Sequence, residues 1–339
     1  MPDARRFDWS AWLTFHDEHV RRGPGYYLTQ GDYFDWTFRD NPYNPTPGEY
    51  QFALWHEGNE IIGYIGRIWS SMLVNGAERR CLWQETSFVR PDRRGQGIGT
   101  ELYAWVAGED VTGNIQGVKQ PQVDRVLEKT LGTYGKRECM QRAVLRADKF
   151  AEATYYWPLT RMTMADGGPV LQHDFSTWAA NLWARSAPRY GMTTHRTKPW
   201  LRWRFLDHPR AWQYRLIATD AAVAIVRTER AHLHTLVRIV DLWGVQVQDV
   251  QEVVKAVIQY ATGVAATAVD FLCTGWPDGE AFDALGFERW AGAEMSQLPL
   301  LFNPLDTSPR EEQVTLYGKG VTQDQLMYIT RADDGRDRP

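Results

Sequence analysis

A glycine-rich segment, V-R-P-D-R-R-G-Q-G-I-G-T from Val89 to Thr100, is the part of the sequence best suited to bind an anion. Glycines at positions 95, 97 and 99 allow backbone conformations closed to residues with a Cβ atom, so successive N–H groups can point at one anion. Apolar residues at helical spacing follow the loop, and a helix that starts there adds the positive end of its dipole. The pattern therefore predicts a site for phosphate or pyrophosphate.

Two common phosphate-binding motifs differ from this segment. No G-K-S or G-K-T follows the glycines, which excludes a P-loop. The order G-x-G-x-G-T also departs from the G-x-G-x-x-G fingerprint of dinucleotide-binding domains. The alternative is a glycine-rich hairpin with solvated arginines, which the order of strand, loop and amphipathic helix disfavours.

The elements that position the loop follow from the spacing of apolar residues. Strands are predicted at 51–55, 60–69, 81–89 and 114–119, and helices from about 99 and at 123–131. Asn75-Gly76 suits the turn of a hairpin between the second and third strands. Asp8 suits the cap of an earlier helix. This order predicts a mixed α/β domain.

The sequence contains an internal repeat. D-W-S-A-W at 8–12 returns as D-F-S-T-W at 174–178, and F-D-W-T-F-R-D-N-P at 34–42 returns as L-R-W-R-F-L-D-H-P at 201–209. The two matches keep one order and nearly one spacing. We therefore predict two domains with one fold, the first at 1–160 and the second at 173–330. A linker at 161–172 joins them, and a tail follows at 331–339.

Length and composition, 339 residues with 43% hydrophobic and 24% charged, predict a soluble protein of two domains. No apolar run approaches the length of a membrane span or a secretory signal, so we expect a cytoplasmic protein without a membrane partner. The net charge of -4 disfavours a general nucleic-acid partner. The three cysteines and eight histidines lack the spacing of a disulfide framework or a metal site.

The glycine loop resembles the acyl-CoA-binding motif of the GNAT N-acyltransferase superfamily, whose pattern Q/R-x-x-G-x-G/A is matched by Arg94, Gly97 and Gly99. The resemblance implies two tandem GNAT-like domains of mixed α+β class, each a mostly antiparallel sheet flanked by helices. It implies acetyl-CoA or another acyl-CoA as co-substrate, without a metal. The loop amides would hold its pyrophosphate, and its pantetheine arm would lie between two splayed strands. The implied contact residues are Phe88, Val89, Arg90, Arg94, Gly95, Gln96, Gly97, Ile98, Gly99 and Thr100.

The second domain lacks the glycine pattern. Its strand at 238–243 is followed by one glycine, Gly244, and by valines, which resist the backbone turns of an anion site. Asp249 and Glu252 near the next helix start would cap that helix and repel a phosphate. We therefore predict one acyl-CoA site per chain.

An amine acceptor must lose a proton during acyl transfer. Glu85 is the candidate base because it lies on the strand that leads into the loop, although a solvated or arginine-paired carboxylate fits the sequence equally well. Simple alternation places Ser87 on the face of Glu85, as a candidate acceptor contact, and Gln84 on the opposite face. The resemblance also implies a general-acid tyrosine after the start of the last helix. The next tyrosine there is Tyr134, in L-G-T-Y, which resembles the family's L-G-F/Y segment.

The predicted function is transfer of an acyl group, with acetyl as first choice, to the amine of a small molecule such as an amino sugar or another metabolite. Trp203, Asp241 and Trp243 are candidate acceptor contacts, since an aromatic face and a carboxylate suit a polar amine with a flat apolar side. Packing of the second core is the alternative role for these residues. Acetylation of a peptide or protein amine, and a non-catalytic acyl-CoA-binding module, remain open.

Overall fold

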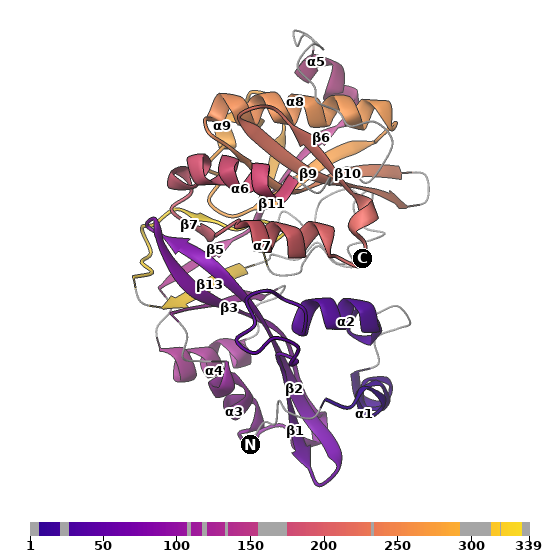
Figure 1. Ribbon diagram of the computed structural model, residues 1–339, viewed down its shortest axis with the longest axis vertical. Coiled ribbons are helices and arrows are strands. Elements are labelled where there is room, and N and C mark those ends of the chain that lie inside the picture. Colours follow the sequence, from indigo (N-terminus) through magenta and orange to yellow (C-terminus); the bar gives the residue numbers. More distant parts are fainter. Residues whose placement is uncertain are drawn as a thin grey trace. The chain divides into compact units, whose positions relative to one another are not determined.

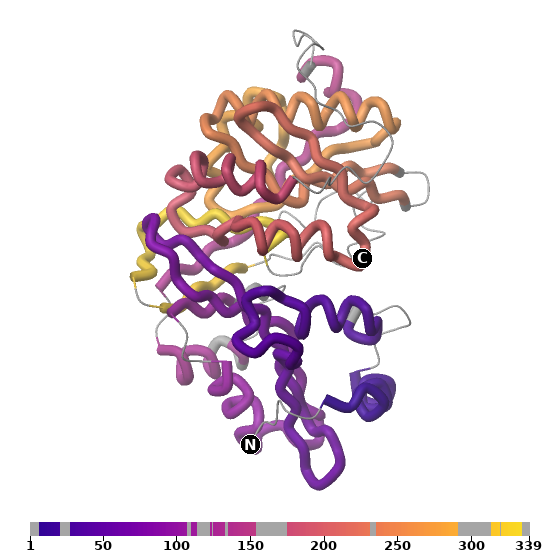
Figure 2. Tube along the Cα trace, in the orientation of Figure 1, coloured from indigo at the N-terminus to yellow at the C-terminus, as the bar shows by residue number. Residues whose placement is uncertain are grey.

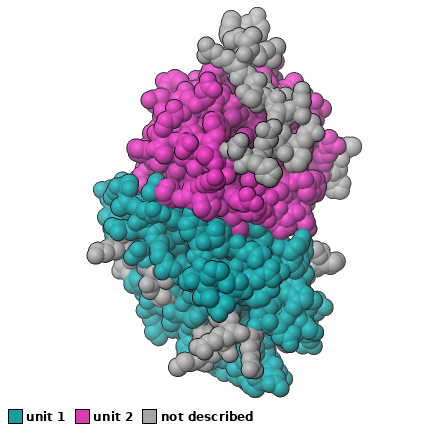
Figure 3. Space-filling model, viewed as in Figure 1, with its two compact units in different colours: residues 1–137, 314–325, 338–339 teal, residues 138–313, 326–337 magenta. Residues whose placement is uncertain are grey.

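The computed structural model describes residues 7–20, 27–106, 110–116, 121–132, 135–154, 175–231, 234–291, 313–318 and 320–333. The chain forms two compact units, which Figure 3 distinguishes by colour. Unit 1 comprises residues 1–137, 314–325 and 338–339, and unit 2 comprises residues 138–313 and 326–337. Each unit is a mixed sheet with helices, which confirms the predicted α+β class.

Unit 1 is built on a sheet in the order β2, β3, β4, β13, β5, with β1 also paired to β2 (Figure 1). Its strands are β1 (Phe52–Glu57), β2 (Glu60–Val74), β3 (Ala77–Val89), β4 (Val111–Gln116), β5 (Lys136–Cys139) and β13 (Gln313–Gly318). Its helices are α1 (Trp9–Phe15), η1 (His16–Val20), η2 (Tyr27–Thr29), α2 (Gly31–Phe38), η3 (Pro91–Arg93), α3 (Ile98–Trp105) and α4 (Pro121–Leu131). The pairs β1/β2 and β2/β3 are antiparallel, whereas β3/β4 is parallel.

Helices cover both faces of the unit 1 sheet (Figure 1). On one face, Leu102 and Tyr103 of α3 pack in a core cluster with Ile65 of β2. On the other face, aromatic rings from α1 and α2 contact rings of the sheet. These rings belong to Trp12, Phe34, Phe38, Phe52 and Tyr64. The sheet is therefore buried on both faces near the start of the glycine loop.

Unit 2 contains a sheet in the order β12, β6, β11, β10, β9, β8, and it also contributes the strands β7 and β14, which pair in parallel. Its strands are β6 (Gln141–Arg146), β7 (Met192–Thr194), β8 (Tyr214–Ala218), β9 (Ala222–Ala231), β10 (His234–Gly244), β11 (Ala268–Cys273), β12 (Glu288–Ala291) and β14 (Met327–Tyr328). Its helices are η4 (Ala147–Lys149), α5 (Phe150–Thr154), α6 (Phe175–Ser186), η6 (Ala187–Arg189), α7 (Lys198–Leu201), η7 (Arg202–Leu206), η8 (Ala211–Gln213), α8 (Val247–Gly263) and α9 (Gly279–Asp283). The valines predicted to face the core from α8, at 250, 253, 254 and 257, are fully buried.

The units do not follow the domain bounds expected from the repeat. β6 precedes the expected boundary at residue 160 but pairs with β11 of unit 2, whereas β13 lies in the sheet of unit 1. The trace in Figure 2 can be followed by colour from the indigo amino end to the yellow carboxy-terminal strands. The expected linker at 161–172 lies outside the described residues.

The repeated segments have matching local geometry. Asn41 Oδ1 accepts a hydrogen bond from Tyr43 N at 2.9 Å, and His208 Nδ1 accepts one from Arg210 N at 2.9 Å. The residue before the proline therefore binds the backbone two residues ahead in both copies. Each unit also has a shift in strand register. In unit 1 it lies between Ile65 and Arg67 in the pairing of β2 with β3. In unit 2 it lies next to Val240 in the pairing of β10 with β9. The two units therefore share these local details of backbone geometry.

Local signals located the start of α1 and the turn between β2 and β3 correctly, whereas the strand expected at 114–119 lies at Val111–Gln116. Asp8 caps α1 by accepting hydrogen bonds from Ser10 N at 2.8 Å and Ala11 N at 3.2 Å. Asn75 and Gly76 form the predicted hairpin turn with φ values of 53° and 76°.

Within the described ranges, no helix is long and apolar enough to cross a membrane.

Candidate functional site

The glycine loop connects β3 to α3 in unit 1. Gly95 and Gly97 have φ values of 81° and 86°, in the left-handed region that favours glycine, and Gly97 occupies the N-cap position of α3. A Cβ atom built on Gly95, Gly97 or Gly99 would meet no other atom within 4 Å. The first two glycines are thus required by the backbone, and all three leave open space beside the loop.

The backbone amides of this loop are available to a ligand. Among the residues that the structure describes, no protein atom accepts a hydrogen bond from the N–H groups of residues 95–100. The first intrahelical bond runs from Glu101 N to Gly97 O at 3.1 Å. Unpaired N–H groups at the positive end of a helix form a favourable site for an anion.

Two of the three loop arginines are engaged in ion pairs. Arg90 lies 3.0 Å from Glu60 and 2.7 Å from Asp92, and its hydrogen bonds lower the pKa of Asp92 to about 2. Arg93 lies 3.0 Å from Glu57. The exposed Arg94 donates from Nε to Val89 O at 3.1 Å. Arg94 is thus the loop arginine without an ion pair among the described residues.

The end of β3 has an open edge. Its parallel pairing with β4 runs from Cys81, opposite Val111, to Gln84, opposite Asn114. β3 continues to Val89, and beyond Gln84 its pairing partners in the described part of the chain are residues of β2. The two strands therefore separate just before the glycine loop, as expected for strands that admit a pantetheine arm.

A β-bulge in β3 changes the side-chain faces near Glu85. Ile65 lies opposite Ser87 and Arg67 lies opposite Gln84, so β3 has one extra residue between these pairs. Ser87 and Gln84 consequently share the α3 face, and Ser87 Oγ lies 3.0 Å from Tyr103 OH. The expectation that Ser87 shares a face with Glu85 is therefore wrong, because it assumed an unbroken strand.

Glu85 itself lies at the bulge, opposite Gly66, and is 9% exposed. It is a largely buried carboxylate four residues from the end of the strand, beyond the last β3/β4 pair. The other catalytic candidate, Tyr134, lies outside the described residues. In the same described part of the chain, no group of three or more His, Cys, Asp or Glu side chains is arranged to hold a metal ion.

The equivalent loop of unit 2 uses its amides internally. Gly244 N donates to Tyr190 OH at 3.0 Å, Val245 N donates to Ala221 O at 2.9 Å, and Gln246 N donates to an Asp249 oxygen at 2.9 Å. A Cβ atom on Gly244 would lie 2.8 Å from a methyl group of Val250, so this glycine serves close packing.

The acidic residues near this second loop have separate roles. Asp249 caps α8, as the sequence predicted. Glu252 does not cap the helix but pairs with Lys255 at 2.8 Å. Together with the internal hydrogen bonds, this geometry explains why the second loop does not resemble an anion site.

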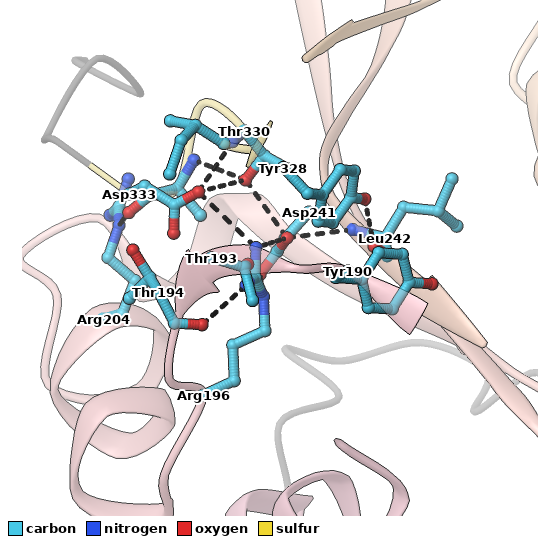
Figure 4. A network of polar contacts seen from close by, with 12 residues as sticks. Tyr190, Thr193, Thr194, Arg196, Arg204, Asp241, Leu242, Tyr328, Thr330 and Asp333 are labelled. Carbon is cyan, nitrogen blue, oxygen red and sulfur yellow. Dashed lines mark hydrogen bonds and ion pairs between the residues drawn. The ribbon is translucent and has the colours of Figure 1, made fainter. Parts of the chain in front are cut away.

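The three acceptor candidates of unit 2 lie in its core. Trp203 is 5% exposed, and Asp241 and Trp243 are fully buried. Asp241 accepts two hydrogen bonds from Arg196, at 2.8 Å and 2.9 Å, and one from Thr330 at 3.1 Å (Figure 4). Because these three side chains are buried, we infer that they stabilise unit 2 and do not contact a small amine.

We expect Asp241→Asn to lower the free energy of unfolding by about 1.5–3 kcal/mol, because it removes the carboxylate that accepts two hydrogen bonds from the fully buried Arg196 and leaves Asp333, at 3.5 Å, as its charged partner. The matched control is Asp283→Asn, which breaks an exposed pair with Arg289 and should cost about 0–1 kcal/mol. Denaturant unfolding of both variants measures the difference. Equal stability of the two variants would contradict the structural role of Asp241.

Comparison with known proteins finds a family match over part of the chain. Residues 10–112, which include Glu85 and the glycine loop, match the model of the Acetyltransferase (GNAT) family. None of the curated proteins matches the chain significantly by sequence.

Two solved structures resemble most of the chain. One is a conserved protein of unknown function from Enterococcus faecalis V583, described as a probable N-acyltransferase, with 10% identity and a TM-score of 0.55 over 93% of this chain and 71% of that chain. The other is a GCN5-related N-acetyltransferase from Anabaena variabilis ATCC 29413, with 11% identity and a TM-score of 0.55 over 93% and 72%. At these identities the likeness shows the fold, which is GNAT-like over most of the chain. The match to the family model assigns residues 10–112, with their glycine loop, to the GNAT family.

Proposed function

We propose that the protein is an acyl-CoA-dependent N-acyltransferase that transfers an acyl group, with acetyl as first choice, to the amine of a small molecule such as an amino sugar or another metabolite. The observation that carries the proposal is the set of backbone N–H groups at residues 95–100 that have no acceptor in the described protein. These groups lie at the amino end of α3 and suit a pyrophosphate.

The residues of unit 1 fit the shape and charge of acyl-CoA. The open space beside Gly95, Gly97 and Gly99 gives phosphate oxygens access to the loop backbone. Arg94 supplies a positive charge that no described carboxylate neutralises. The open edge of β3 from Glu85 to Val89 offers backbone groups to the pantetheine arm.

Glu85 is the proposed base. Bound acyl-CoA supplies an activated thioester, and the reaction forms the N–C bond of the amide while the C–S bond breaks. The amine proton must leave during this exchange, and Glu85 accepts it directly or through water. Its carboxylate lies at the bulge, where the strand has left β4 and its side chain is 9% exposed. Tyr134 remains the proposed donor of a proton to the departing thiolate.

The test combines binding and turnover. The full chain is titrated with acetyl-CoA by calorimetry and then incubated with acetyl-CoA and a panel of amino sugars, small amines and peptides, with free thiol as the readout. Thiol release that depends on a small amine supports the proposal. Release with peptides alone would make the protein a peptide acetyltransferase, and binding without any release would make it a binding module.

A further inference from the structure

Two hydroxyl groups lie close together in the layer between β3 and α3. Ser87 Oγ and Tyr103 OH are 3.0 Å apart. Tyr103 is 5% exposed and packs in a core cluster with Leu102 and Ile65. A hydroxyl group offers one donor and two acceptor positions, so a single bond to Tyr103 leaves Ser87 with hydrogen-bonding capacity.

Ser87 is placed beside the open edge of β3. The last pair between β3 and β4 is Gln84 with Asn114, so Ser87 lies in the part of the strand that has left its neighbour. The bulge at Glu85 turns Ser87 to the α3 face, where its hydroxyl group lies 3.0 Å from Tyr103 OH. Ser87 is half-buried and thus accessible to a ligand in the gap.

We propose that Ser87, oriented by Tyr103, forms a hydrogen bond with an amide group of the pantetheine arm of coenzyme A. This inference rests on the proposed function of unit 1. The pantetheine arm carries amide groups that lose water when they enter the gap between the strands, and each needs a polar partner there. A hydroxyl group serves as such a partner because it can either donate to the amide oxygen or accept from the amide nitrogen.

The test compares two ligands that share their phosphates. Coenzyme A has the pantetheine arm, whereas adenosine 3′-phosphate 5′-diphosphate lacks it. We expect Ser87→Ala and Tyr103→Phe to weaken coenzyme A binding by about 3- to 10-fold in calorimetry, which is typical for one neutral hydrogen bond. Their affinity for adenosine 3′-phosphate 5′-diphosphate should be unchanged. Ser87→Thr keeps the hydroxyl group and should retain the affinity for coenzyme A.

Tyr317→Phe is the matched control, because Tyr317 lies in the same core cluster but on β13. It should leave both affinities unchanged. An unchanged affinity of Ser87→Ala for coenzyme A would overturn the proposal. An equal loss for both ligands would overturn it too, because that pattern indicates a distorted phosphate loop. If the unmodified protein binds neither ligand, the proposed function fails together with this contact.

Discussion

Gly97→Asp is expected to weaken acyl-CoA binding by at least about 100-fold while the protein remains folded. The substitution adds a Cβ atom at a φ of 86° and places a carboxylate at the amino end of α3. Two like charges about 4 Å apart near a protein surface repel each other by roughly 4 kcal/mol, which exceeds the free energy of a 100-fold change. A carboxylate near a helix amino end favours the helix itself, so folding should survive. Calorimetry with acetyl-CoA measures the loss.

Gly48→Asp is the matched control for this variant. Gly48 also has a left-handed backbone, with a φ of 81°, and a Cβ atom on it would meet nothing within 4 Å. The two variants therefore introduce the same change of charge and a comparable backbone strain. They differ in position, because Gly48 lies outside the glycine loop. Undiminished binding by Gly97→Asp, or equal loss in both variants, would contradict the assignment of the loop.

Glu85→Gln is expected to lower kcat by about 100- to 10,000-fold, the usual range for loss of a general base. The amide side chain keeps nearly the same size but cannot accept the amine proton at neutral pH. Because Glu85 lies away from the phosphate loop, the affinity for acetyl-CoA should be retained. Steady-state thiol release and calorimetry on one preparation separate these two effects.

Glu78→Gln serves as the control for Glu85. It makes the same chemical change on the same strand, but Glu78 is exposed near the opposite end of β3. Its kcat should equal that of the unmodified protein. Unchanged kcat in Glu85→Gln, with acyl-CoA still bound, would mean that another group accepts the proton.

The parts of the fold that local chemistry determines could be predicted from the sequence. Glycine at 95 and 97 gave the left-handed loop, since few other residues adopt that backbone conformation. Asn75-Gly76 gave the hairpin, and Asp8 gave the start of α1. The alternating or helical spacing of apolar residues was sufficient for most strands and helices next to the loop.

Features that depend on distant partners could not be predicted in this way. One extra residue in β3 moved Ser87 to the other face, and strand alternation contains no signal for such a bulge. Asp241 looked like a ligand contact because its partner, Arg196, lies 45 positions away in the chain. The pairing of β6 with β11 joins residues still further apart, so the repeat alone did not reveal the unit bounds.

Titration of the full chain with acetyl-CoA by calorimetry tests the central claim most directly, because the two units differ in the hydrogen bonding of their loops. In unit 1, the N–H groups of residues 95–100 have no acceptor within the described protein, whereas those of residues 244–246 donate to Tyr190, Ala221 and Asp249. We predict saturable binding at one site per chain. Two equivalent sites, or no binding at all, would contradict this account.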